Sequence, residues 1–421
     1  MNRNIAPHLN ELVAPTLLPH QREELSNGVE VIYLNDPRQE IFKMDVIFPA
    51  GTYYQPQPIV ASTMLNLLNE GTRYHTSAEI AELFDFHGAY VEYNCGLHQS
   101  ELSLIALQKY ASQTIRQVAE MVQASTFPEK ELAIYLRNRK QEHLINLEKT
   151  TYLASQEFRR AFFGEQHPYA NYFTVSDFDT IQRDVIEQFY RERIHATGCR
   201  ILVSGKVDGQ VLQEIHRHFS TLPPTALPPE PHFTPSPSSP QRYHVPKTDA
   251  VQASIRMGMS GVHLLDEDYA HFQLLNMVLG GYFGSRLMSN IREEKGYTYS
   301  IHSFNVSLKQ AAYWNVATDV NTDQVEATLT EIHKEISRLR EELIPDEELN
   351  LVKNYFHGEL LRELDGVFSQ ADALKHKLHY GIDNTFYLKI MKRIKTCTPE
   401  ELLQAAQKYF LPEKMYTIVV G

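Results

Sequence analysis

The chain has 421 residues, of which 43% are hydrophobic, 10% aromatic and 22% charged. This composition excludes a disordered or collagen-like chain and is typical of a globular protein with two or three domains of about 100–200 residues. Its 52 acidic and 40 basic residues leave a net charge of −12. General nucleic-acid binders usually carry the opposite balance, so we expect no nucleic-acid partner.

The sequence also argues against a membrane protein and a disulfide-rich protein. No apolar run approaches the ~20 residues of a membrane span, and residues 1–15 lack the pattern of a secretory signal. We therefore expect a cytoplasmic protein without a membrane span. Cys95, Cys199 and Cys397 lie far apart and form no CxxC pair, which disfavours a disulfide framework or a thiolate metal site.

Hydrophobic patterning predicts a mixture of strands and helices in the first half. The expected strands and helices are, in chain order, strands Val29–Leu34 and Lys43–Phe48, helices Ser62–Leu68 and Glu79–Phe86, strands Tyr90–Tyr93 and Glu101–Ala106, and a long helix from about Glu129 to Phe163. Neighbouring strands joined by short turns favour an antiparallel sheet with helices on one face. The predicted fold class is therefore α+β.

A proline-rich stretch, Leu222–Pro240, divides the chain nearly in half. It contains eight prolines. Because proline removes a backbone donor and restricts φ, the stretch cannot be a helix or an inner strand, and we interpret it as an extended, semi-rigid linker.

Landmarks recur in the same order on both sides of this linker. Gly51 and Gly261 each follow a predicted strand, Pro128 and Pro345 each open a long helical pattern, and Gly205 and Gly421 each close an apolar strand. A further pair, Gly71 and Gly280, follows the helical run after the first landmark. We infer two copies of one α+β domain. The predicted organisation is a first domain over 1–222, a linker over 223–241 and a second domain over 242–421.

The second half contains a glycine-rich segment, residues 280–300, that reads GGYFGSRLMSNIREEKGYTYS. It lacks the surrounding βαβ unit of a dinucleotide-binding fingerprint and predicts a turn followed by a short helix, Ser285–Glu294. Arg292 and Tyr299 lie seven residues apart across Gly296. From the residues alone, the simpler interpretation is a solvated helix charge and a tyrosine packed on the sheet.

The repeat, the linker and this segment together resemble the insulinase/pitrilysin-type metallopeptidases, over essentially the whole chain from Leu25 to Gly421. The similarity is greatest to processing-peptidase-like members and respiratory-complex core subunits. It implies that Arg292 and Tyr299 hold a peptide against a zinc site, since both side chains can donate hydrogen bonds to a peptide carbonyl or its oxyanion. It also implies substrate binding by the glycine-rich loop, here Gly280, Gly281, Gly284 and Ser285.

The first half departs from the family pattern at the zinc site. The family carries an inverted HxxEH motif, in which two histidines ligate Zn²⁺ and the glutamate activates water. Anchored on the Glu70-Gly71-Thr72 run, the motif falls on residues 62–66, where Ser62 and Asn66 replace the histidines and Leu65 replaces the base. Leucine cannot accept a proton from water. The family's third ligand, a glutamate expected near Glu142, would have no histidine ligands beside it. We therefore expect no metal and no cofactor in this chain.

Three hypotheses follow for the function. In the first, the chain is the non-catalytic subunit of a heterodimer, contributing Arg292, Tyr299 and the glycine-rich loop while a zinc-bearing partner of the same family cleaves peptides. In the second, it is a scaffold or peptide-binding core subunit without a catalytic role. The expected partner is the zinc-bearing subunit or, alternatively, a second copy of this chain in a homodimer, with peptides as substrates. In the third, it is a peptidase with an unusual metal site. Whether the chain is itself an enzyme is left open, and we favour the first hypothesis.

Overall fold

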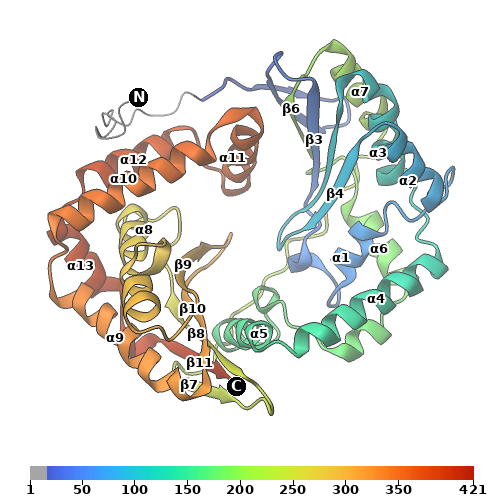
Figure 1. The fold of residues 1–421 in the computed structure, drawn as a ribbon. Coiled ribbons are helices and arrows are strands. Elements are labelled where there is room, and N and C mark those ends of the chain that lie inside the picture. The colour runs from blue at the N-terminus through green and yellow to red at the C-terminus, as the bar shows by residue number, and fades with distance from the viewer. Residues whose placement is uncertain (1–16) are drawn as a thin grey trace. The chain divides into compact units, whose positions relative to one another are not determined.

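The computed structural model describes residues 17–421 and divides them into two compact units (Figure 1). The first unit contains Leu18–Ala250 together with Tyr416–Gly421, and the second contains Val251–Met415. Within the described residues, no helix has the length and apolar character needed to cross a membrane. The three cysteines are all free thiols.

The first unit is built on a six-stranded sheet. In spatial order its strands are β1 (Gln21–Glu24), β2 (Glu30–Asn35), β6 (Arg200–Gly205), β3 (Ile41–Phe48), β5 (Ser100–Leu107) and β4 (Tyr90–Cys95). Every neighbouring pair is antiparallel except β2 and β6, which are parallel. The same unit holds a second parallel pair, β7 (Arg242–Val245) with β11 (Tyr416–Val420).

Seven α-helices accompany this sheet. They are α1 (Val60–Asn66), α2 (Ser77–Phe86), α3 (Ala111–Ala124), α4 (Glu129–Leu147), α5 (Thr150–Phe163), α6 (Arg183–Arg193) and α7 (Gly209–Phe219). The apolar sides of α1, α3, α6 and α7 pack with buried residues of β2, β3, β5 and β6 in one hydrophobic core. This burial is the main source of stability for the unit.

The second unit contains a three-stranded antiparallel run and a set of helices. Its strands are β8 (Gln252–Ser260), β9 (Ile301–Ser307) and β10 (Ala312–Asn321), with β10 paired to both others. Its α-helices are α8 (Tyr269–Asn276), α9 (Val325–Glu341), α10 (Asp346–Glu363), α11 (Gly366–Tyr380), α12 (Thr385–Thr396) and α13 (Pro399–Tyr409). Trp314 of β10 is fully buried, and its indole nitrogen donates to Asn276 Oδ1 at 2.8 Å.

The α+β class is confirmed, and the repeated landmarks fall on matching elements. Counted along the sequence, each copy has one parallel strand pair and one antiparallel run: β2–β6 with β3–β5–β4 before the proline-rich stretch, and β7–β11 with β8–β10–β9 after it, although β7 and β11 belong to the first compact unit. Gly51 follows β3 and Gly261 follows β8, while Pro128 and Pro345 are the N-cap residues of α4 and α10. The boundaries 1–222, 223–241 and 242–421 stay a prediction. The compact units instead divide the chain after Ala250 and Met415.

The expected long helix from Glu129 to Phe163 is wrong, because the chain forms two helices there. Lys149 has extended dihedral angles, φ −92° and ψ 120°, which end the helical hydrogen-bond ladder. The carbonyl of Leu147 accepts instead from Lys247 Nζ at 3.3 Å. Periodicity alone did not reveal this break, since the apolar pattern continues on both sides of it.

The proline-rich stretch has no helix or strand, as expected, but it is not a free linker. Ser236 N donates to the carbonyl of Phe163 at 3.1 Å, and Ser238 N donates to that of Ala161 at 2.8 Å. The ring of Phe233 lies 5.2 Å from that of Tyr53. These contacts hold the stretch against the end of α5 and the turn after β3, within the first unit.

The strand-ending glycines of the two copies share a steric constraint. A Cβ atom on Gly51 would lie 2.2 Å from the carbonyl oxygen of Leu97, and one on Gly261 would lie 2.7 Å from the carbonyl carbon of Tyr313. The turn facing Gly51 is held by backbone hydrogen bonds from Thr52 N to Gly96 O and from Tyr53 N to Leu97 O. The backbone at Leu97 therefore cannot move away from Gly51 without breaking these hydrogen bonds.

We expect Gly51→Ala to lower the free energy of unfolding by about 1–3 kcal/mol, because the new methyl group overlaps fixed backbone. Gly209→Ala is the matched control, since a Cβ there meets no atom within 4 Å and the residue begins α7. Thermal and denaturant unfolding of both variants measures the difference. Equal stability of the two variants would contradict the close approach at Gly51.

Candidate functional site

The glycine-rich segment, residues 280–300, contains the end of one π-helical turn and the whole of a second. Helix α8 continues into η5 (Met277–Gly281), a turn follows, and a helix beginning at 286 passes into η6 (Met288–Glu294). The predicted short helix is therefore present, in a mainly π-helical form. π-helical turns are rare and are found frequently at functional sites, so the segment is a candidate site on geometry as well as on sequence.

Close packing explains part of the glycine content. A Cβ on Gly280 would lie 2.7 Å from Ser303 Oγ and 2.8 Å from Ser303 N, so only glycine lets η5 approach β9 this closely. Gly280 and Ser285 are buried, whereas Gly281 is half-buried and Gly284 is exposed. The substrate-binding role of these four residues stays a prediction. The structure shows close packing at Gly280, whereas the hydroxyl of Ser285 is buried without a hydrogen-bond partner among the described residues.

Two polar contacts anchor the helix that follows the turn. The Arg286 guanidinium makes a two-pronged ion pair with Glu348 of α10, at 2.8 Å for both Nε–Oε1 and Nη2–Oε2. Asn290 Nδ2 donates to Glu331 Oε2 at 2.9 Å and to Glu335 Oε1 at 2.8 Å, both on α9. These contacts, each at a partly or fully buried position, fix the helix axis and the base of the Arg292 side chain.

The helix ends where the sequence predicts, at Gly296. This residue has φ +68°, a left-handed conformation that glycine adopts without strain. Tyr297 N donates to the carbonyl of Ile291 at 3.0 Å, which caps the last turn. The chain then enters β9, so Arg292 and Tyr299 lie on the two sides of one tight bend.

Arg292 and Tyr299 are brought together, with a third residue that sequence analysis missed. The Cζ atom of Arg292 lies 5.2 Å from the ring centre of Tyr299 and 4.6 Å from that of Phe283. The guanidinium therefore contacts two aromatic rings, an arrangement that attracts a cation electrostatically. Phe283 lies in the turn between the two π-helical segments and is 60% exposed. Its contact with Arg292 is visible only in the structure.

The backbone at Tyr299 is positioned by hydrogen bonds of the two adjacent residues, Thr298 and Ser300. Thr298 Oγ1 donates to the carbonyl of Asp319 at 2.7 Å, and Thr318 Oγ1 donates to the carbonyl of Ser300 at 2.9 Å. These bonds fasten the residues on both sides of Tyr299 to β10. The phenol itself is 86% exposed within the chain, so its hydroxyl is accessible to a ligand.

The degenerate zinc-motif positions lie on α1, where their side chains serve the fold. Ser62 Oγ donates to the carbonyl of Ile59 at 3.0 Å, and Asn66 Nδ2 donates to the carbonyl of Ser62 at 2.8 Å. Leu65 is 1% exposed and belongs to the hydrophobic core. None of the three positions offers an imidazole or a carboxylate to a metal ion.

A cavity of about 290 Å³ adjoins α1, and its charges do not suit a cation. Ser62, Tyr135, Arg139, Glu142 and Arg159 are among its lining residues. Glu142, the expected third ligand position, forms an ion pair with Arg139 one helical turn away on α4. Two guanidinium groups thus line the cavity against one carboxylate.

His143, also in this cavity, does not complete a metal site. Its Nδ1 lies 3.1 Å from the hydroxyl of Tyr152, and burial lowers the pKa of the imidazole. Over residues 17–421, no group of three His, Cys, Asp or Glu side chains converges around α1. The residues present therefore do not fit the zinc ion that the resemblance implies for this position.

Comparisons with known proteins agree with this geometry. A family model described as the peptidase M16 inactive domain matches residues 180–356. An uncharacterized zinc protease of Rickettsia bellii is 23% identical over 92% of this chain and 94% of its own length. The non-peptidase homolog YmxG of Helicobacter pylori is 22% identical over 82% of this chain and 80% of its own length.

Among solved structures, a peptidase M16 inactive domain from Pseudomonas fluorescens has the same fold. Its TM-score is 0.86 at 22% sequence identity, and the match covers 96% of this chain and 98% of that one. The repeat, the glycine-rich segment and the sequence matches all point to the same group of proteins. The chain is therefore similar in sequence and fold to proteins of the M16, or insulinase/pitrilysin-type, peptidase family, and it lacks the HxxEH zinc motif at residues 62–66.

Proposed function

We propose that this chain is the non-catalytic subunit of a two-subunit peptidase, in which a zinc-bearing partner of the same family hydrolyses the peptide. In this proposal Arg292 and Tyr299 bind the peptide as it is cleaved. The observation that carries the proposal is the surface cluster of Phe283, Arg292 and Tyr299, called here the aromatic–arginine cluster. The cluster is present in a chain that has Ser62, Leu65 and Asn66 at the positions of the family's zinc motif.

The cluster suits hydrogen bonding to a peptide group. Stacking on aromatic rings uses the faces of the guanidinium, whereas its five N–H donors lie in its plane. The phenol of Tyr299 supplies a further donor nearby. Two donors aimed at one carbonyl oxygen stabilise the negative charge that develops there during hydrolysis.

The scaffold hypothesis is also supported by one observation. Gly280 is explained by its close packing against Ser303 of β9, without a ligand. If the whole segment is retained for packing, the aromatic–arginine cluster has no catalytic consequence. The experiments below separate the two functions.

We expect the chain alone to hydrolyse no peptide, with or without added chelator. We also expect Leu65→Glu, which restores the residue type of the family base, to give no activity and to destabilise the chain by about 2–5 kcal/mol. The reason is that the carboxyl group would enter the hydrophobic core without a partner. Leu65→Met keeps the volume and is the control. Chelator-sensitive hydrolysis by the unmodified chain would support a peptidase with its own metal site and contradict the proposal.

In a complex reconstituted with a zinc-bearing family member, Arg292→Ala and Tyr299→Phe should each slow peptide hydrolysis by about 10²–10³-fold. Each variant removes one donor from the transition state. Arg362→Ala and Tyr90→Phe are matched controls, because both remove an exposed group of the same kind outside the cluster. Co-purification checks that assembly is intact. Unchanged rates in the two cluster variants would favour the scaffold function.

Phe283→Ala should slow the same complex by only about 2–5-fold. The phenyl ring positions the guanidinium through a cation–π contact, which at an exposed site is worth about 0.5–1 kcal/mol. Phe283→Tyr, which retains an aromatic ring, should restore most of the rate. A loss as large as that of Arg292→Ala would show that Phe283 does more than position Arg292.

A further inference from the structure

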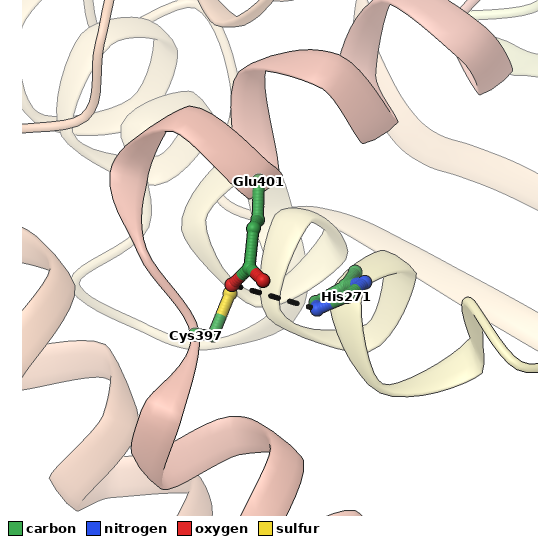
Figure 2. A group of neighbouring side chains, drawn as sticks. All are labelled: His271, Cys397 and Glu401. Atoms are coloured by element: carbon green, nitrogen blue, oxygen red, sulfur yellow. Dashed lines mark ion pairs between the residues drawn. The ribbon is translucent and has the colours of Figure 1, made fainter.

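Three side chains with metal-ligating atoms converge in the second unit, remote in sequence from the zinc-motif positions. They are His271 of α8, Cys397 at the end of α12 and Glu401 in the first turn of α13 (Figure 2). One nitrogen, one sulfur and one oxygen atom from these residues all lie within 4.8 Å of one another. The distance between His271 Nε2 and Glu401 Oε2 is 3.9 Å.

Local structure explains why Cys397 and Glu401 face the same point. Thr398 caps α13, and Glu401 closes the capping box, accepting from Thr398 N at 2.9 Å. Cys397 immediately precedes the cap, so its thiol and the carboxylate of Glu401 lie on the same side of the helix start. Helix α8 packs against both α12 and α13 and supplies His271.

The donor set and its spacing suit a zinc ion. Zn²⁺ binds imidazole nitrogen, thiolate sulfur and carboxylate oxygen at about 2.0–2.3 Å in tetrahedral geometry, which separates the ligand atoms by about 3.3–3.6 Å. The ligand atoms lie within 4.8 Å of one another, so binding would draw them closer together. The Glu401 side chain is 49% exposed and that of His271 is 12% exposed, so water can reach the fourth position.

Asp268 is a carboxylate close to the other ring nitrogen of the histidine. Its Oδ1 lies 3.7 Å from Nδ1 of His271, so a small movement would bring the two atoms within hydrogen-bond distance. Asp268 Oδ2 accepts from Lys408 Nζ at 2.6 Å and from the hydroxyl of Tyr409 at 2.8 Å, which fixes the carboxylate in place. A carboxylate behind a ligating histidine is the usual arrangement at protein metal sites, where it orients the ring.

The surroundings of Cys397 disfavour a bare thiolate. Burial and the charge of Glu401 raise the pKa of Cys397 to about 12, while Lys353 of α10 and Arg393 of α12 act in the opposite direction. The ammonium of Lys353 donates to the Cys397 carbonyl at 2.6 Å. A divalent ion would supply the positive charge that the thiolate lacks, and its binding would release the thiol proton.

We propose that His271, Cys397 and Glu401 bind one Zn²⁺ ion, which joins α8 to the start of α13. With three protein ligands and an accessible fourth position, the ion would take water as its fourth ligand while joining these helices. This inference goes beyond the proposed function and does not depend on it. It also revises the sequence-based expectation of no metal, which concerned the HxxEH positions and the absence of CxxC pairs.

The test uses the full chain, freed of metal by chelation and titrated with Co²⁺ as a spectroscopic probe and with Zn²⁺ as competitor. We expect one Co²⁺ per chain with a thiolate-to-cobalt charge-transfer band, displacement by Zn²⁺ and a higher melting temperature with either ion. Cys397→Ser should remove the band and weaken binding by about 100-fold or more. Asp268→Asn should weaken binding by about 10–100-fold while keeping the band.

Cys95→Ser is the matched control, because Cys95 is a half-buried thiol in the first unit and should leave the band unchanged. His271→Gln provides a second ligand variant, and circular dichroism of each metal-free variant shows whether it is folded. Absence of the band in the unmodified chain, or its persistence in folded Cys397→Ser, would overturn the proposal.

Discussion

The contact between Gly280 and Ser303 determines the arrangement of the glycine-rich segment. Because Gly280 has no side chain, the π-helical turn η5 lies directly on β9. The backbone nitrogen and the hydroxyl of Ser303 leave no room there for a Cβ atom. The turn that follows must then begin at this point and leave the sheet. The helix that carries Arg292 begins at that turn. Tyr299 lies just before β9, the strand on which Gly280 packs. One steric constraint therefore places both functional candidates.

Helix α1 of the first unit shows how residues at the motif positions can serve the fold alone. Leu65 fills the core, and the side chains of Ser62 and Asn66 hydrogen-bond to carbonyls of their own helix or its start. A glutamate in place of the buried Leu65 would place a carboxyl group in the core without a partner. A shared fold therefore does not by itself imply a shared site.

The two candidate sites of the second unit differ in what their surroundings allow. The aromatic–arginine cluster is exposed and rests on a rigid base, made by the Arg286–Glu348 ion pair and the hydrogen bonds of Asn290. That combination suits a transient ligand. The His271–Cys397–Glu401 group is mostly buried where three helices meet, which suits a permanently bound ion that contributes to folding.

Several features were determined by the sequence alone, because they depend on local chemistry. Strand alternation, the prolines that open α4 and α10, the left-handed bend at Gly296 and the substitutions at residues 62–66 all follow from residue type and spacing. Only the tertiary structure decided the features that join distant residues. The break after Leu147 involves Lys247, the proline-rich stretch is held by the carbonyls of Ala161 and Phe163, and Phe283 meets Arg292 across a turn. His271 lies 126 residues before Cys397. No periodicity links such positions, since their proximity arises from how helices and strands pack rather than from the spacing of residues along the chain.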